Sequence, residues 1–300
     1  MTARYPRVAD APTLLSTRSW SDYALIDSGD GRKLERYGPF RVIRPEPQCL
    51  WGPALPVSDW EKADAVFDPT DEEEEGRWRF ARLAPENWPL QWGDVRFHGR
   101  FTNFRHLAFF PEQAANWSWI DARIRSAGRP LRILNLFGYT GVASLVCAAA
   151  GAQVTHVDAS KKSVAWAREN AILSRLDEKP VRWLVEDAKK YVQRELRRGV
   201  TYDGIILDPP KFGRGPTGET WRLFEDLPEM VRLCGQLLTK DASFMLLNAY
   251  AARISGAALS GLLADTLKDR AGEIDWGELA LEQEGGNRRI GLSFFARWLS

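Results

Sequence analysis

The spacing of hydrophobic and polar residues changes near residue 130. From Leu131 onward, short apolar runs alternate with longer segments in which apolar residues recur at helical spacing. A short continuous apolar run suits a strand that is covered on both faces, and helical spacing gives a helix one apolar side. Strands and helices in alternation build a mostly parallel sheet with helices on both faces. The sequence therefore predicts a doubly wound α/β domain over residues 131–300.

The expected strands of this domain lie at residues 131–137, 153–157, 181–185, 202–207 and 243–247. The expected helices lie at residues 142–150, 160–176, 188–198, 220–238 and 255–268. Two further strands, at 278–283 and 290–298, flank Gly285-Gly-Asn-Arg288, a sequence suited to a turn. The expected fold class is α/β, with a Rossmann-like, mostly parallel seven-stranded sheet that ends in a C-terminal antiparallel hairpin.

Residues 1–100 lack helical periodicity and are interrupted by proline, glycine and aromatic residues. Residues 77–82 and 94–98 alternate large and charged side chains at period two, as strands with one solvated face do. We therefore expect a smaller β-rich domain that helps to bind the substrate. Residues 101–130 are expected to link the two domains through a helix. The acidic run at 71–75 repels itself and predicts a solvated loop.

Composition narrows the class of protein. Hydrophobic residues make up 44% of the chain and charged residues 27%, as in an ordinary globular protein. There is no run of about 18 apolar residues and no apolar leader segment, so we expect a cytoplasmic protein without a membrane partner. The net charge of +1 gives no globally basic surface, although basic stretches occur at 32–33, 41–44 and 77–82. Three widely spaced cysteines indicate neither disulfides nor a metal site.

A glycine turn, Gly138-Tyr-Thr-Gly141, follows the strand at 131–137. Glycine can take backbone angles closed to other residues and lets a ligand approach the main chain. Strand, turn and helix together begin a nucleotide-type site, in which ligands lie beyond the carboxyl ends of the strands. The turn lacks the third glycine of a dinucleotide fingerprint and the Lys-Ser/Thr of a P-loop. A diphosphate cradle is therefore not supported.

Acidic residues follow the next two strands. Asp158 lies where a carboxylate can accept hydrogen bonds from both hydroxyls of a ribose. Asp187 could accept a hydrogen bond from an adenine amino group. Each aspartate could instead cap the helix that follows it. Both alternatives remain open from the residues alone.

The fourth strand ends in Asp208-Pro-Pro-Lys-Phe212. Pro209 and Pro210 stiffen this loop and remove its backbone donors, which leaves carbonyls that can accept hydrogen bonds. These carbonyls and Asp208 could grip a substrate amino group, and Phe212 offers a face on which a flat base could stack. Lys211 could meet a phosphate or the polar edge of a base. A proline pair alone is usually only a turn, but its position at a strand end indicates a substrate loop.

Four motifs resemble, in order and spacing, those of class I S-adenosylmethionine-dependent methyltransferases: Leu134-Asn-Leu-Phe-Gly-Tyr-Thr-Gly141, Asp158, Glu186-Asp187 and Asp208-Pro-Pro-Lys-Phe212. The chain resembles most the bacterial group that contains large-subunit ribosomal RNA methyltransferases. The resemblance covers residues 100–300 well and the amino-terminal domain only loosely. An RNA-binding motif of the kind that some relatives carry in front is not recognisable here.

The resemblance implies the cofactor S-adenosyl-L-methionine, with its methionine part near Gly138, its ribose at Asp158 and its adenine at Asp187. A segment like 110–113 also reaches the cofactor in that family, which implies a role for Gln113. The resulting set of expected cofactor contacts is Gln113, Asn135, Phe137, Gly138, Tyr139, Thr140, Gly141, Asp158, Ala159, Ser160, Asn170, Asp187, Ala188 and Asp208. Asp208 to Phe212 are expected to act on the methyl acceptor. Methyl transfer from a sulfonium requires that donor and acceptor be aligned and that the site be shielded, and it requires no metal.

The cysteines bear on the acceptor atom. Cytosine C5 methylation generally uses a cysteine nucleophile, but the substrate loop and residues 247–250 contain none. Cys147 and Cys234 fall within expected helices, where a packing role is predicted. We therefore expect transfer to a nitrogen, or else an oxygen, most simply a base nitrogen of ribosomal RNA. The alternatives are a methyltransferase for a small molecule or a protein side chain, which the near-neutral charge favours, and a catalytically silent cofactor-binding protein.

Overall fold

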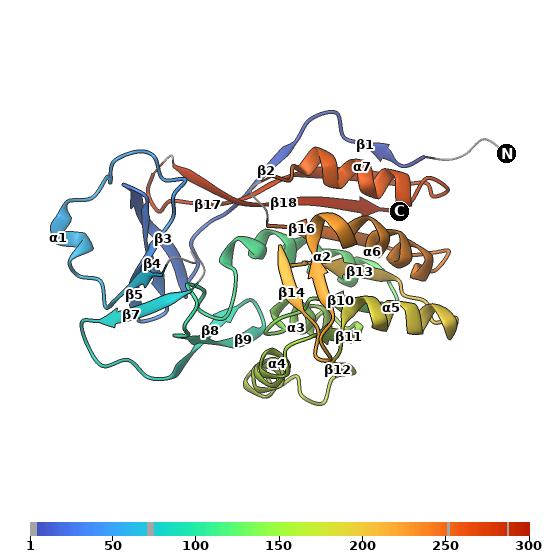
Figure 1. Cartoon of the computed structure of the whole chain (residues 1–300), viewed down its shortest axis with the longest axis horizontal. Coiled ribbons are helices and arrows are strands. Elements are labelled where there is room, and N and C mark those ends of the chain that lie inside the picture. The colour runs from blue at the N-terminus through green and yellow to red at the C-terminus, as the bar shows by residue number, and fades with distance from the viewer. Residues whose placement is uncertain (1–4, 71–74, 251–252, 287) are drawn as a thin grey trace. The chain divides into compact units, whose positions relative to one another are not determined.

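The structure is a computed structural model, and it describes residues 5–70, 75–250, 253–286 and 288–300. The chain forms two compact units (Figure 1). The larger unit comprises the described residues of 1–15, 116–279 and 292–300, and the smaller unit comprises those of 16–115 and 280–291. The boundaries expected at residues 100 and 130 divide the chain into continuous segments. In the structure, each unit instead combines segments that are distant in sequence, because strands near both chain ends run from one unit into the other.

The larger unit contains a nine-stranded sheet with the order β1-β17-β18-β16-β13-β10-β11-β12, and β2 also pairs with β17. The four pairings from β16 to β12 are parallel, whereas β18 is antiparallel to β16. The sheet exceeds the expected seven strands because β1 and β2 pair with β17. The strands span Arg7–Val8 (β1), Thr13–Thr17 (β2), Arg132–Leu136 (β10), Gln153–Asp158 (β11), Val181–Val185 (β12), Gly204–Leu207 (β13), Phe244–Ala249 (β16), Glu273–Glu282 (β17) and Arg289–Leu299 (β18).

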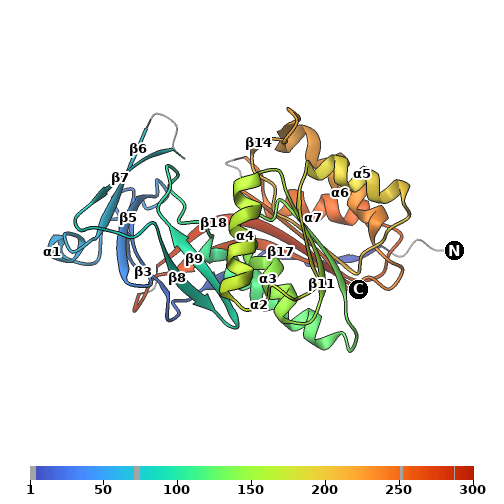
Figure 2. The ribbon, with the colours of Figure 1, turned by 90° about the horizontal axis from the view of Figure 1, so that it is seen from below.

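Helices cover both faces of this sheet (Figure 2). Side chains of α2 and α3 pack on one face, and those of α5, α6 and α7 pack on the other. Neighbouring residues of β10, Ile133 and Leu134, enter opposite core clusters, which confirms that this apolar run is a strand covered on both faces. The helices span Ala114–Ser126 (α2), Val142–Ala149 (α3), Lys161–Leu173 (α4), Ala188–Arg197 (α5), Leu223–Leu237 (α6) and Gly256–Thr266 (α7).

The predicted alternation of strands and helices is confirmed, but the prediction is wrong at one place. Residues 220–222, expected to begin a helix, form strand β15 (Thr220–Arg222). It pairs in antiparallel register with β14 (Phe212–Arg214), so a short hairpin separates the substrate loop from α6. Strands of three residues have too few positions to show a period of two, which is why the pattern did not reveal them.

The smaller unit is rich in β structure, as predicted. A five-stranded sheet has the order β3-β4-β5-β6-β7, and β8 pairs with β9. The elements span Tyr23–Gly29 (β3), Arg32–Tyr37 (β4), Phe40–Pro45 (β5), Val57–Trp60 (α1), Ala65–Pro69 (β6), Gly76–Phe80 (β7), Asn87–Trp92 (β8), Val95–Arg100 (β9) and the 3-10 helix Pro111–Gln113 (η1). The expected acidic loop at 71–75 lies, apart from Glu75, outside the described residues.

A buried ionic cluster surrounds Glu35 of β4. Its carboxylate accepts two hydrogen bonds of 2.8 Å from Arg44, and one each from the hydroxyls of Tyr23 (2.9 Å) and Tyr37 (3.0 Å). Lys33 Nζ lies 3.9 Å from the same carboxylate. Burial acts to raise the pKa of Glu35, but Arg44 and Lys33 together lower it to about 2. Lys33 and Arg44 belong to the basic stretches 32–33 and 41–44, which are local candidates for a basic surface. They are instead buried and neutralise this carboxylate.

We expect Glu35→Gln to lower the free energy of unfolding by about 3 kcal/mol, because it leaves the Arg44 guanidinium buried without its charge partner. The pH dependence follows from the pKa of Glu35, which is about 2 in the fold and has an ordinary value of 4.5. The carboxylate therefore stabilises the fold above pH 4.5, and this contribution is lost as the pH falls from 4.5 towards 2. Urea unfolding of both proteins across this range measures the effect.

The control for this variant is Asp68→Asn in the same unit. Asp68 forms an ion pair with Arg79, but the two side chains are 46% and 68% exposed. An exposed pair contributes about 0 to 1 kcal/mol, so this variant should unfold almost as the wild type does. Equal destabilisation by the two substitutions would show that the buried cluster has no special role.

Candidate active site

The turn between β10 and α3 is tightly constrained. Phe137 and Tyr139 have left-handed backbone angles, with φ of 58° and 49°, and Gly141 has φ of 82°. A β-carbon at Gly138 would lie 2.4 Å from the His156 ring, so glycine is required there by space. Gly141 has the left-handed backbone conformation for which a glycine was expected. Gly138 is needed for a different reason, which is the close packing of a buried ring.

Buried polar side chains hold this turn from behind. Asn170 of α4 donates from Nδ2 to the carbonyl of Thr140 at 2.9 Å. Asn135 donates from Nδ2 to Oγ of Ser144 at 2.9 Å, and this oxygen lies 3.0 Å from Nδ1 of His156. Burial lowers the pKa of His156 to about 3, so the ring is neutral near pH 7. The structure thus gives Asn135 and Asn170, both expected near the cofactor, a role in supporting the turn.

Asp158 ends β11 beside this turn. Its carboxylate accepts hydrogen bonds from the backbone N–H groups of Tyr139 and Ser160, both at 2.8 Å. Burial raises the pKa of Asp158, although the two donors act in the opposite direction. The cap of α4 is Ser160, whose hydroxyl accepts from the Ser163 N–H group. The alternative that Asp158 caps this helix is therefore wrong, and its carboxylate is fixed at the strand end next to Ala159.

Asp187 follows β12 and caps α5. Its side chain accepts a hydrogen bond of 2.9 Å from the backbone N–H group of Lys190. Ala188 is buried and begins the helix, and Glu186 forms an ion pair with Arg194. The helix-cap alternative for Asp187 is therefore observed. A role toward a cofactor is compatible with it, because a carboxylate can accept several hydrogen bonds.

Asp208 follows β13 and is held by a neighbouring strand. Nδ2 of Asn248, in β16, donates to Oδ1 of Asp208 at 2.7 Å. Burial raises the pKa of Asp208 to about 6, although the hydrogen bond from Asn248 acts to lower it. Ser293 Oγ in turn donates to Oδ1 of Asn248 at 3.4 Å. The carboxylate of Asp208 is therefore oriented by Asn248, and its pKa lies above that of an ordinary aspartate.

The rest of the substrate loop differs from expectation in one detail. The carbonyl of Pro210, expected to accept from a substrate, already accepts a hydrogen bond of 2.8 Å from Nε1 of Trp221. Pro209 is buried, whereas Lys211 and Phe212 are exposed. The Phe212 side chain is 53% exposed at the start of β14. An open aromatic face thus lies four residues beyond Asp208.

Gln113 lies in η1 and belongs to the smaller unit, whereas the other expected site residues belong to the larger unit. The side chain is 7% exposed, and its backbone N–H group donates to the carbonyl of Phe110 at 3.1 Å. Its assignment to the cofactor remains a prediction.

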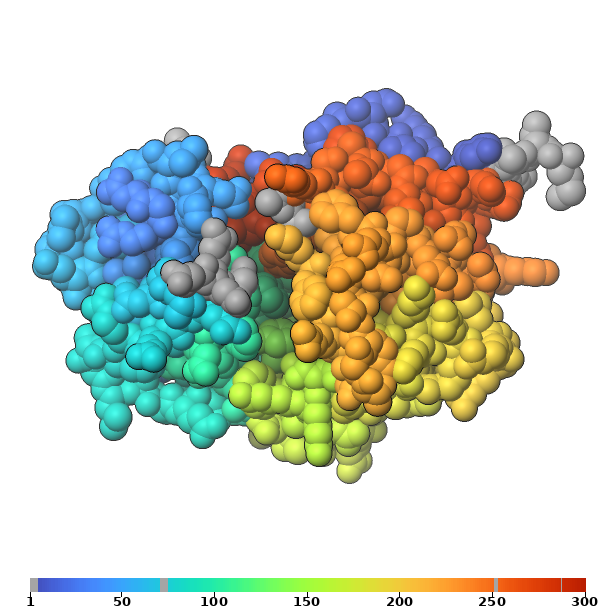
Figure 3. Space-filling model, in the orientation of Figure 1, coloured from blue at the N-terminus to red at the C-terminus, as the bar shows by residue number. Residues whose placement is uncertain are grey.

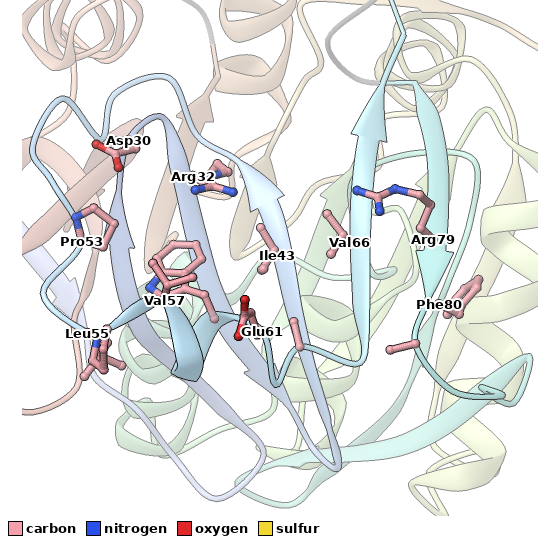
Figure 4. Close-up of a pocket in the computed structure, with 14 residues that line it drawn as sticks. Asp30, Arg32, Ile43, Pro53, Leu55, Val57, Glu61, Val66, Arg79 and Phe80 are labelled. Atoms are coloured by element: carbon pink, nitrogen blue, oxygen red, sulfur yellow. The ribbon is translucent and has the colours of Figure 1, made fainter.

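A cavity of about 660 Å³ lies in the smaller unit. Arg32, Ile43, Val66 and Arg79 project into it from four neighbouring strands (Figure 4). The guanidinium of Arg32 lies over the indole of Trp60, 5.3 Å from the ring centre. None of the residues expected at the active site lines this cavity.

All three cysteines are buried, and burial raises the pKa of each thiol. Cys147 and Cys234 belong to core clusters, which confirms the predicted packing role. Within the described parts of the chain, no cluster of three His, Cys, Asp or Glu side chains suits a metal ion. The described helices include none with the length and hydropathy needed to span a bilayer.

Three residues that shape the site were not anticipated: His156, Trp221 and Asn248. The position of Asn248 beside Asp208 could have been predicted, because parallel neighbouring strands end at the same edge of a sheet. Leu207 pairs with Leu247, so the residues that follow them, Asp208 and Asn248, must be adjacent. The pairing of Trp221 with Pro210 carried no comparable signal in the sequence.

The fold and the site define a class of protein. Strands β13, β10, β11 and β12 are adjacent and parallel, so their carboxyl ends meet at one edge of the sheet. That edge carries Asp208, the glycine turn, Asp158 and Asp187 in this order. Carboxylates accept hydrogen bonds from the hydroxyl and amino groups of a nucleoside, and no basic residue occurs in 137–141 to favour a diphosphate. These features define an α/β protein of the doubly wound class, and its acidic residues indicate a nucleoside-type ligand at the carboxyl edge of the sheet.

Comparison with known proteins gives the family. The model of the S-adenosylmethionine-dependent methyltransferase family matches residues 78–250, and the chain belongs to this family. The crystal structure of an Agrobacterium tumefaciens S-adenosylmethionine-dependent methyltransferase is 48% identical, with a TM-score of 0.95, over 100% of this chain and 96% of that one. A Streptococcus mutans methyltransferase of the same cofactor class is 17% identical, with a TM-score of 0.70, over 93% and 75% of the two chains, and shows the fold.

Curated relatives share shorter segments. Ribosomal RNA large subunit methyltransferase K/L of Shewanella oneidensis is 38% identical over 189 residues, which are 62% of this chain and 25% of that protein. The protein of the same name from Shewanella sp. MR-4 is 38% identical over 116 residues, which are 38% of this chain and 16% of that protein. The chain thus spans about a sixth to a quarter of the length of these two relatives. The family to which the chain belongs is defined by the cofactor S-adenosylmethionine and by methyl transfer.

Proposed function

We propose that this enzyme methylates a base nitrogen in RNA, with ribosomal RNA as the first candidate. The observation that carries the proposal is the loop from Asp208 to Phe212, in which a partly buried, oriented carboxylate is followed by an exposed aromatic ring. A carboxylate can accept a hydrogen bond from a base amino group, and an exposed ring can stack on a base. The names of the ribosomal RNA methyltransferases that match this chain support the same substrate class.

We assign the cofactor to the edge formed by β10, β11 and β12. Asp158 would accept hydrogen bonds from the ribose hydroxyls, and Asp187 with Ala188 would contact the adenine. The backbone of the Gly138–Gly141 turn would hold the methionine part. The residues fit this ligand because the Asp158 carboxylate is fixed at the strand end by two backbone donors and can accept further hydrogen bonds from hydroxyl groups. When bound, S-adenosylmethionine supplies an electrophilic methyl group on a sulfonium.

Asp208 would orient the acceptor nitrogen and receive its proton. By accepting an N–H hydrogen bond, the carboxylate directs the nitrogen lone pair toward the methyl group. As the new N–C bond forms and the C–S bond of the donor breaks, with its electron pair left on sulfur, the nitrogen would become acidic, and its proton would pass to Asp208 and then to solvent. The pKa of Asp208 is raised to about 6, so the group is ionised near pH 7 and is a stronger base than an ordinary aspartate. Phe212 would fix the plane of the base.

The smaller unit would hold the RNA outside the reacting centre, as we propose for residues 1–100. Arg32, Arg41, Arg77 and Arg79 are exposed there, unlike Lys33 and Arg44. The cavity beside Arg32 and Arg79 combines guanidinium groups with apolar walls, which suits a nucleotide (Figure 4).

In the larger unit we assign a seven-stranded core, β10 to β13 and β16 to β18, with β17 and β18 as the C-terminal hairpin.

Methyl transfer to RNA from cells that lack the gene tests the proposal. Purified enzyme and labelled S-adenosylmethionine should label ribosomal RNA or ribosomal subunits from such cells, but not those from wild-type cells, which already carry the modification. Mass spectrometry of the nucleosides should identify a base methylated on nitrogen. Absence of label in RNA and subunits would contradict the proposal.

A second candidate function is methylation of a small molecule or a protein side chain. The net charge of +1 favours it, because it provides no general attraction to a polyanion. Label that appears in a metabolite extract or in protein, and not in RNA, would support this alternative. The intact substrate loop and the family assignment argue against a catalytically silent protein.

We expect Phe212→Ala to raise KM for the RNA about tenfold and to leave the cofactor affinity unchanged, because one base stack contributes about 1 to 3 kcal/mol. Phe212→Tyr is the matched control, because it keeps an aromatic face at the same position. It should retain a KM close to that of the wild type. Steady-state kinetics with RNA from the deletion strain measures both variants, and an equal KM in the alanine variant would exclude stacking by Phe212.

A further inference from the structure

The hairpin of β14 and β15 presents exposed side chains on its outer positions. Phe212, Arg214, Thr220 and Arg222 are exposed, and the hairpin, amber in Figure 3, lies at the surface of the larger unit. Trp221 is the exception, because its side chain is only 6% exposed and belongs to the core. The hairpin therefore inserts one large ring into the enzyme.

Trp221 contacts both sides of the candidate active site. Its indole N–H group donates to the carbonyl of Pro210 at 2.8 Å, in the middle of the substrate loop. Its ring centre lies 4.8 Å from that of Phe137, the first residue of the turn that we assign to the cofactor. Phe137 has a left-handed φ of 58°, so its ring is carried by a constrained piece of backbone. One side chain thus connects the donor turn with the acceptor loop.

The far end of the hairpin is also attached to the cofactor side. Lys190 donates from Nζ to Oγ1 of Thr217 at 3.2 Å and forms an ion pair with Glu219. The backbone N–H group of the same lysine donates to the side chain of Asp187. The hairpin is therefore held at its tip and by its buried ring, and both attachments lead to segments assigned to the cofactor.

We propose that Trp221 is a positioning residue that sets the acceptor loop in line with the cofactor turn. The inference rests on the proposed role of Asp208 to Phe212 as the acceptor loop. Methyl transfer requires the nitrogen, the methyl carbon and the sulfur in line, and small displacements of a bound acceptor slow such reactions strongly. Cofactor binding that orders the turn would order the acceptor loop through the Phe137, Trp221 and Pro210 contacts.

Trp221→Phe separates the two contacts of this residue. It keeps an aromatic ring against Phe137 and removes the N–H donor to Pro210. We expect kcat to fall about tenfold, as for the loss of one hydrogen bond that acts on alignment, with cofactor affinity unchanged. Trp276→Phe is the control, because it removes a comparable indole hydrogen bond of 2.9 Å, to Ala9, at a distant strand of the same unit. It should leave kcat unchanged.

Hydrogen exchange on the full chain provides a readout that needs no acceptor. In the wild type, S-adenosylmethionine should slow amide exchange in both 137–141 and 211–222. In Trp221→Phe the slowing should persist in 137–141 and fall about tenfold in 211–222. Equal slowing of 211–222 in wild type and variant, or an unchanged kcat, would overturn the proposal. Failure of RNA as a substrate would instead appear as absent transfer by the wild type, with this exchange pattern intact.

Discussion

Asp158→Ala is expected to weaken S-adenosylmethionine binding about 1000-fold, because it removes the two hydrogen bonds that we propose the carboxylate accepts from the ribose hydroxyls, each of about 2 kcal/mol. The wild-type carboxylate is held at the end of β11 by the N–H groups of Tyr139 and Ser160, so it is ordered before the ligand arrives. Because burial raises the pKa of Asp158, wild-type affinity should begin to fall at a higher pH than for an ordinary aspartate. Calorimetry of the purified protein measures both effects.

A cofactor analogue that lacks both ribose hydroxyls separates binding from support of the turn. If Asp158 binds the hydroxyls, the wild type should bind the analogue poorly, and Asp158→Ala should bind cofactor and analogue equally well. If the substitution instead disturbs the turn through Tyr139 and Ser160, it will weaken both ligands by the same factor. That second result would place the ribose elsewhere.

The positions of Asp158 and Asp208 could be predicted from the sequence because both are local features. An apolar run marks a buried strand, and the first polar residue after it must lie at the carboxyl edge of the sheet. The glycine turn is equally local, because Gly138 and Gly141 directly follow β10. Strand order was not needed to find these residues. It was needed to see that they meet at one edge.

The surroundings of these residues could not be predicted, because they depend on contacts between distant segments. His156 occupies the space behind Gly138, and Asn248 reaches Asp208 from a strand forty residues away in sequence. The charge of a side chain was equally unable to predict whether that side chain is buried. Lys33 and Arg44 look like exposed basic residues in the sequence, and only the pairing of β4 with β5 reveals that they surround Glu35.

These contacts also explain why the site can act with few reacting groups. The turn is held by Asn135 and Asn170, and the acceptor loop by Trp221 and Asn248. Such supports restrict where the turn and the proposed acceptor loop can lie, and alignment of donor and acceptor is the main requirement of a transfer whose donor is already activated. In the proposed mechanism, the reacting side chains then reduce to the carboxylate of Asp208.

Asp208→Asn is expected to lower kcat about 1000-fold, because an amide cannot take the proton of the acceptor nitrogen. Cofactor affinity should change far less, since the amide keeps the shape of the side chain. In the wild type, kcat/KM should rise with pH and level off above about 6, where the carboxylate is ionised. The variant should show no such limb. Single-turnover rates across the pH range measure this, and an unchanged limb in Asp208→Asn would assign the titration to another group.

Asn248→Leu tests the same assignment from the opposite direction. The hydrogen bond from Asn248 lowers the pKa of Asp208, so its loss should move that pKa above about 6. The acidic limb of kcat/KM should therefore shift to higher pH, and activity should largely recover well above the new pKa. In the double variant with Asp208→Asn, the shift should vanish, because the titrating group is gone. A shift that persists in the double variant would show that Asn248 acts on a different acid, and Asp208 would then serve only to hold the acceptor.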